Sequence, residues 1–82
     1  MASLVAKDPG ILIKRCMSVA SEIIKLPSKH IIMDYDEEAD VLYMSFRRPQ
    51  RATDTEQTDD GILIRKDGKK IVGLTILSAS KR

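Results

Sequence analysis

Two apolar segments joined by a short polar turn stand out in the C-terminal part of the chain. Residues 62–64 and 71–77 are rich in β-branched side chains, and Asp67-Gly68 lies between them. Asp-Gly favours a type I′ turn, because both central residues of that turn need a positive φ angle. The pattern therefore predicts a β-hairpin. Gly73, inside the second strand, predicts a β-bulge or the close approach of another part of the chain.

A helical period of apolar residues covers the N-terminal third. Asp8-Pro9 is typical of a helix start, with Asp8 as the N-cap, and Pro27 stops the pattern near Leu26. We therefore expect a helix over about residues 9–26 with one wide apolar side. That side is expected to pack on a sheet through Leu12, Cys16, Val19 and Ile23.

Alternating apolar and polar residues predict further strands between the helix and the hairpin. Residues 30–35 and 41–46 are expected to be strands, and 53–58 alternates threonine with acids, which fits a short exposed edge strand. All connections are short, so the strands are expected to form an antiparallel β-meander of four or five strands. The predicted fold is α+β, a single domain over residues 1–82 with its sheet over about 30–78.

The predicted strands carry apolar side chains on both faces. One face would hold Ile31, Met33, Val41 and Tyr43, and the other Ile32, Leu42, Met44 and Phe46. One helix covers only one face of a small sheet, so the other face would expose a patch larger than soluble monomers usually show. This predicts a homodimer or a small protein partner. The monomeric alternative is that residues 2–6 fold back as a further cover.

Composition narrows the class of protein. The chain has 82 residues, 43% of them hydrophobic and 32% charged, which is typical of one small globular domain. Cys16 is the single cysteine, and on the apolar side of the helix it should act as a small buried hydrophobe. The absence of a cysteine pair fits a reducing, cytoplasmic location. No apolar segment approaches the roughly 20 residues of a membrane span, so no membrane partner is expected.

The acidic residues between the first two strands form the clearest chemical cluster. Their spacing resembles a calcium loop, but Ala39 stands where the loop needs Gly, and Ser45 where it needs Glu. We interpret the segment as a solvated turn in which Asp36 and Asp40 accept backbone N–H bonds. The cluster consists of Asp34, Asp36, Glu37, Glu38 and Asp40.

No other catalytic arrangement is recognisable. His30 is the only histidine and has no nucleophile or second ligand in a known spacing. The sequence therefore predicts no catalytic residue, no cofactor-binding residue, no metal ligand and no cofactor, and the protein is expected not to be an enzyme.

Basic residues are the remaining candidates for binding. Lys14, Arg15 and Lys25 share the polar side of the helix, and three arginines crowd the loop after residue 46. The chain has only two Tyr, one Phe and no Trp, so no stacking platform for bases emerges. We interpret the basic residues as a solvated face, and the sequence argues against a nucleic-acid partner.

Two stretches resemble signatures of the domain-of-unknown-function 2283 family of small prokaryotic proteins. Residues 35–43, YDEEADVLY, resemble its YDPEADALY signature. Residues 60–64, 67–68 and 71–80 are similar to its second signature, DGVIVD followed by DGRIVGIEILDAS. The departures are Glu37 in place of Pro, Arg65-Lys66 where acidic residues are common, and Thr75 and Ser78 in place of Glu and Asp.

The resemblance implies a compact β-meander without an established activity, and some members look like partners of toxin-like proteins. The functional expectation is a non-catalytic protein-interaction or self-associating module, antitoxin-like in its mode of action. Two alternatives stay open at this point. One is a nucleic-acid-binding regulator that uses the basic side of the helix, and the other is a cation-dependent enzyme that uses the acidic turn.

Overall fold

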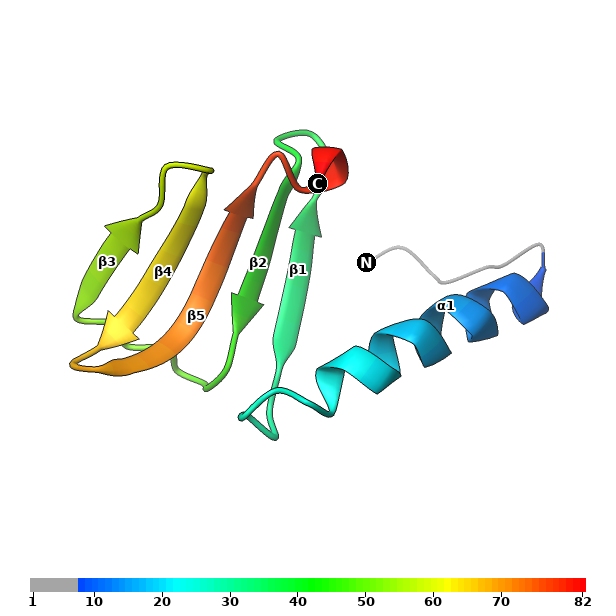
Figure 1. Ribbon diagram of the computed structural model, residues 1–82, viewed down its shortest axis with the longest axis horizontal. Coiled ribbons are helices and arrows are strands. Elements are labelled where there is room, and N and C mark those ends of the chain that lie inside the picture. The colour runs from blue at the N-terminus through cyan, green and yellow to red at the C-terminus, as the bar shows by residue number, and fades with distance from the viewer. Residues whose placement is uncertain (1–7) are drawn as a thin grey trace.

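The computed structural model describes residues 8–82 and confirms the predicted α+β fold (Figure 1). One helix precedes a five-stranded antiparallel sheet, and a single 3₁₀ turn, Ala79–Lys81, follows it. Within the described residues, no helix is both long and apolar enough to cross a membrane. The elements are α1 (Pro9–Ile23), β1 (Ile32–Asp36), β2 (Val41–Ser45), β3 (Asp54–Gln57), β4 (Ile62–Asp67) and β5 (Lys70–Leu77).

The strands are arranged in the order β1-β2-β5-β4-β3. β3, β4 and β5 form a meander, whereas the β1–β2 hairpin pairs with the free side of β5, so the order along the chain is broken once. The break is made by residues 46–53, which cross one end of the sheet from β2 to the opposite edge. Phe46 N–H donates to the carbonyl of Val72 at 2.9 Å, and Thr53 N–H donates to that of Lys66 at 2.8 Å.

The prediction for Gly73 is confirmed. The register between β4 and β5 shifts at Arg65/Lys66, which marks a β-bulge opposite this glycine. The side chain of Gln50, on the crossing segment, lies over Gly73, and a Cβ there would come within 3.0 Å of the Gln50 amide and of the Met44 carbonyl oxygen. Gly73 thus lets residues 46–53 lie flat across the end of the sheet.

The helix begins as predicted and ends early. Asp8 Oδ1 accepts hydrogen bonds from Gly10 N–H at 2.9 Å and from Ile11 N–H at 3.4 Å, so Asp8 is the N-cap. α1 ends at Ile23, three residues before the expected Leu26, because Leu26 N–H donates to the Ile23 carbonyl in a tighter turn.

The prediction that α1 packs on the sheet is wrong. Figure 1 shows α1 extending outward beyond the edge strand β1 and covering neither face of the sheet. No residue of α1 is buried, and Cys16, expected to be a buried hydrophobe, is exposed. The cause lies in the connection after the helix, where Ser28 Oγ donates to the Phe46 carbonyl at 3.1 Å and ties the chain to the end of the sheet. Residues 2–6, the alternative cover, lie outside the described residues.

The register assigns each strand residue to a face. Met33 pairs with Met44 and Tyr35 with Leu42, so these four side chains share one face. The predicted grouping of β1 with β2 was therefore wrong by one position. We call this the apolar sheet face and define it by Met33, Tyr35, Leu42, Met44, Ile62, Ile64, Leu74 and Ile76.

The opposite face is mixed rather than apolar, which corrects the expectation of two apolar faces. Polar or charged side chains alternate there with apolar ones. The polar or charged ones are Asp34, Ser45, Arg65 and Thr75, and the apolar ones are Ile32, Val41, Tyr43, Leu63 and Leu77. Among the described residues, only Val41 (8% exposed) and Val72 (0% exposed) count as buried hydrophobic side chains. The single chain therefore has a small hydrophobic core. Covering the apolar sheet face would bury additional apolar side chains.

Candidate interaction surface

The apolar sheet face is open to solvent in the single chain. Met33 is 46% exposed and Tyr35 50%, and the other six residues of this face are half-buried. At the end of the sheet nearest α1, the face continues into a groove of about 550 Å³. The apolar part of the groove is lined by Leu26, Pro27, Phe46, Ile71, Val72 and Leu74. A continuous apolar surface of this kind is typical of a docking site.

The helix presents a second exposed apolar surface. Met17 is 67% exposed, Ile13 56% and Val19 47%, although a helix of a small domain normally buries this side. We call this surface the helix stripe and define it by Leu12, Ile13, Cys16, Met17, Val19 and Ile23. The chain therefore exposes two separate apolar surfaces on different elements.

The polar residues of the mixed face are engaged with one another. The Gln50 side chain accepts from Arg65 Nε at 3.3 Å and donates to Ser45 Oγ at 3.3 Å. Arg65 Nη1 also donates to Thr55 Oγ1 at 3.0 Å. These contacts connect the crossing segment to β2, β3 and β4, so they have a structural role that the sequence did not reveal.

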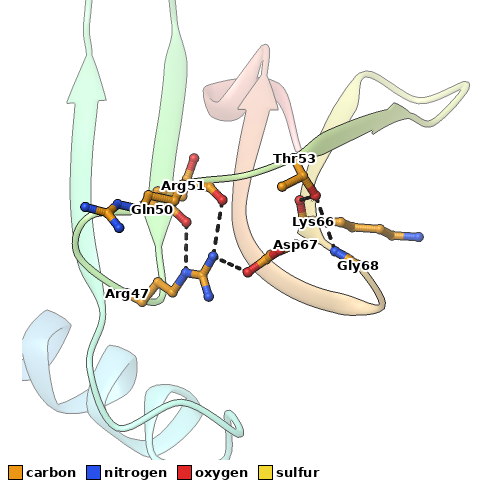
Figure 2. Close-up of polar contacts among 7 residues, drawn as sticks. All are labelled: Arg47, Gln50, Arg51, Thr53, Lys66, Asp67 and Gly68. Carbon is orange, nitrogen blue, oxygen red and sulfur yellow. Dashed lines mark hydrogen bonds and ion pairs between the residues drawn. The ribbon is translucent and has the colours of Figure 1, made fainter.

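Arg47 fastens the same segment to the β4–β5 hairpin, as Figure 2 shows. Its Nε donates to the Gln50 carbonyl at 2.8 Å, and its Nη2 donates to the Arg51 carbonyl at 3.2 Å and to Asp67 Oδ2 at 2.6 Å. The pair with Asp67 is a partly exposed salt bridge, which contributes little by its charge alone. Its geometric role is to hold the end of the sheet that carries the groove.

The acidic turn between β1 and β2 is occupied by structural contacts. Asp36 Oδ1 accepts from Ala39 N–H at 3.1 Å, as predicted. Asp40 instead accepts hydrogen bonds from a residue distant in sequence, Ser80, whose N–H lies at 2.9 Å and whose Oγ lies at 2.7 Å. It also accepts from the nearby Tyr35 Oη at 2.6 Å. Asp40 therefore ties the C-terminal turn to the β1–β2 hairpin. Within residues 8–82, no three His, Cys, Asp or Glu side chains converge as a metal site would require.

These hydrogen bonds shift the titration of both partners. The Tyr35 hydroxyl and the two Ser80 donors stabilise the Asp40 carboxylate and hold its pKa below the usual value. The hydrogen bond to Asp40, with its negative charge, raises the pKa of Tyr35. Asp60 also has a lowered pKa, mainly because Thr58 donates to it.

We expect Asp40→Asn to lower the melting temperature at neutral pH. We also expect the melting temperature of this variant to change less as the pH is lowered. Because the folded-state pKa of Asp40 is depressed, its contribution is present above the unfolded pKa of about 3.9 and is lost as the pH falls through the folded pKa. Asn tolerates the positive φ of 55° at this position, so the backbone is conserved. Thermal melts from pH 2 to pH 7 should show the two proteins converging at low pH. Glu37→Gln, a change of the same charge in the same turn, is the control, and an equal effect there would contradict the role of Asp40.

Charged residues separate towards the two ends of the sheet. The end next to α1 gathers Lys29, His30, Arg47 and Arg48 around a hollow of about 620 Å³, and Lys69 and Lys70 line the neighbouring groove. The opposite end carries the two acidic turns, which contain Glu37, Glu38, Asp59 and Asp60; Arg82 of the C-terminal turn pairs with Asp60 at 3.8 Å, so among the described residues the unpaired acidic charge there is that of Glu37, Glu38 and Asp59. The strand pairing gathers these residues, from segments distant in sequence, into a basic end and an acidic end.

Comparison with known proteins supports the resemblance found in the sequence. A protein-family model described as "Protein of unknown function (DUF2283)" matches residues 32–80, which is the whole sheet and the turn that follows it. No curated protein and no solved structure matches the chain. The helix α1 lies outside the matched residues.

Proposed function

The chain belongs to the DUF2283 family of proteins of unknown function, and we propose from its own surfaces that it is a non-catalytic protein-interaction module that also self-associates. The docking surface in this proposal is the apolar sheet face. The observation that carries it is the exposure of that face together with the helix stripe in one chain whose only buried hydrophobic residues, among those described, are Val41 and Val72.

The polar groups support a non-catalytic role. The Asp36 and Asp40 carboxylates accept hydrogen bonds that hold turns, and Arg47 and Arg65 are engaged with the crossing segment. His30 is exposed and shares its hollow with Ser45, but the Ser45 hydroxyl donates to the Arg47 carbonyl at 2.7 Å, and Ser28 Oγ bonds to the His30 backbone. A general base needs a nucleophile within hydrogen-bonding reach. The carboxylates and arginines named above instead make hydrogen bonds that stabilise turns and the crossing segment.

The partner in this proposal is a second copy or a small protein of complementary shape, as in an antitoxin-like module. Both occupants would meet the same requirement, since apolar side chains at the centre of an interface supply most of its affinity. A homodimer is the simpler of the two, because a two-fold axis lets one surface satisfy two chains.

The test compares two neighbouring positions on one strand. Met33→Glu places a carboxylate on the apolar sheet face, and Ile32→Glu places one on the opposite face; the native side chains are 46% and 37% exposed. Burying an unpaired carboxylate costs several kcal/mol, and each 1.4 kcal/mol is a tenfold change in affinity. In sedimentation at micromolar concentration, Met33→Glu should give monomers, whereas Ile32→Glu should sediment like the unchanged protein. A monomeric unchanged protein that binds no hydrophobic dye would contradict the proposal.

The alternative function, a nucleic-acid-binding regulator, draws support from the basic end of the sheet. Lys29, Arg48 and Lys69 surround its two hollows, in addition to the basic residues on the polar side of α1. Nucleic-acid affinity at the basic end would fall steeply as the salt concentration rises. It would be equally affected by Met33→Glu and Ile32→Glu, because neither residue is one of the basic residues that would contact phosphate. Loss of all association in Met33→Glu therefore favours the interaction module.

A further inference from the structure

We infer that the apolar sheet face is covered by α1 of a second copy, so that two chains exchange their helices in a closed dimer. The inference rests on the proposed function and names the occupant of the docking surface. It starts from the two exposed apolar surfaces of the chain, the helix stripe and the apolar sheet face. Their lengths match: 15 residues of helix span about 22 Å and the eight residues of β5 about 26 Å.

The connection between α1 and β1 disfavours covering by the chain's own helix. Leu26 is half-buried in the groove beside Phe46 and Val72. Ser28 Oγ lies 2.7 Å from the His30 carbonyl oxygen and 3.1 Å from the Phe46 carbonyl oxygen, and its single proton is shared between the two. From this anchored connection α1 extends away beyond β1, as Figure 1 shows. A fold-back onto the same sheet would have to reverse the chain within residues 24–27, where Leu26 is held in the groove, whereas a helix from a second copy leaves this connection as it is.

The exposed area is what a dimer of this kind requires. The chain exposes 6926 Å², whereas compact monomers of 9.2 kDa expose about 4,900 Å². Residues 1–7 can supply at most about 1,000 Å² of the difference in any conformation. The remaining excess of about 1,000 Å² is close to the roughly 800 Å² that each partner buries in a standard interface.

The charge distribution fits an antiparallel arrangement of two copies. A two-fold axis perpendicular to the strands places the basic end of one sheet, with Lys69 and Lys70, beside the acidic end of the other, with Glu37 and Glu38. Opposite charges then approach at both ends and steer the chains into this orientation. Because each copy donates one helix and receives one, the exchange closes without leaving a free apolar surface.

The single cysteine provides a direct test, because Cys16 lies in the middle of α1 and on the helix stripe. One copy, called the receptor because its sheet is to receive the helix of the other copy, carries Cys16→Ser and Met44→Cys. Its only thiol then lies at the centre of the apolar sheet face. The receptor is co-expressed with the unchanged chain, distinguished by a tag, and treated with a short bis-maleimide. The control receptor carries Cys16→Ser and Tyr43→Cys, which moves the thiol to the opposite face of the same strand.

We expect a covalent heterodimer between Cys16 and Met44→Cys, formed about 100-fold faster than with Tyr43→Cys, because docked thiols meet at millimolar effective concentration. Equal rates for the two receptors would overturn the inference. A second measurement uses Met44→Cys with Cys16 retained in the same chain: an intrachain link at monomer mass would overturn it in favour of fold-back.

The two levels of the proposal fail in different ways. A dimer that Met33→Glu dissociates but that gives no Cys16 link would overturn helix exchange and leave the interaction module standing, with sheets stacked directly. A monomer in sedimentation would overturn helix exchange, and a monomer that also binds no hydrophobic dye would overturn both.

Discussion

Val72→Asp is expected to abolish the cooperative thermal unfolding of this protein. Val72 is fully buried, at 0% exposure, and sits at the β-bulge where its carbonyl accepts from Phe46 N–H at 2.9 Å. A buried unpaired carboxylate costs several kcal/mol, against a total stability of about 5–15 kcal/mol for a typical domain. With a core as thin as this one, we expect no folded baseline in circular-dichroism melts at pH 7.

The matched control is Ile71→Asp, which introduces the same charge one residue earlier. Ile71 is 46% exposed, so its carboxylate stays hydrated and the melting temperature should fall by less than about 8 °C, corresponding to roughly 1 kcal/mol. A cooperative transition for Val72→Asp within the same few degrees would show that Val72 does not carry the core.

The local elements of the fold could be predicted from the sequence. The Asp8 N-cap, the alternation in residues 53–58 and the closing hairpin each report on backbone geometry within a few residues, and the structure has all three. The predicted turn is wrong in detail: Asp67 pairs with Lys70, so the turn residues are Gly68 and Lys69, and only Gly68 has the positive φ that a type I′ turn needs at both positions. The packing of α1 could not be predicted in the same way. Helical periodicity identifies which side of a helix is apolar, but not what covers that side. Here the connection anchored by Ser28 decides where the helix goes.

The long-range polar contacts were also beyond the sequence pattern. Asp40 was expected to accept a hydrogen bond at the turn end, yet its partner Ser80 lies forty residues away. Likewise, Gln50 gives no sequence signal for its place over Gly73, although the glycine itself predicted a close approach. Both contacts depend on the strand order β1-β2-β5-β4-β3, which places the C-terminal turn beside the first hairpin. A single-residue register error in β1 was enough to make both faces look apolar.

We expect Met17→Glu to raise the dissociation constant of the dimer by about 100-fold or more, with little effect on the fold of the single chain. Met17 is 67% exposed in the single chain, so the substitution should change its stability by no more than about 0.5 kcal/mol. In the exchanged dimer the same position is buried, and full burial of a Met side chain is worth about 1.5–3 kcal/mol before the cost of desolvating the carboxylate. Sedimentation over a concentration series, with melts under dissociating conditions, measures both quantities.

The control for this prediction lies on the next residue of the same helix. Ser18→Glu adds the same charge on the polar side, where Ser18 Oγ donates to the Lys14 carbonyl at 3.1 Å, and it should leave the dissociation constant nearly unchanged. Equal dissociation constants for the two variants would place the helix stripe outside the interface. If Met33→Glu still gave monomers in that case, the two chains would have to associate through their sheets alone, and α1 would need another partner.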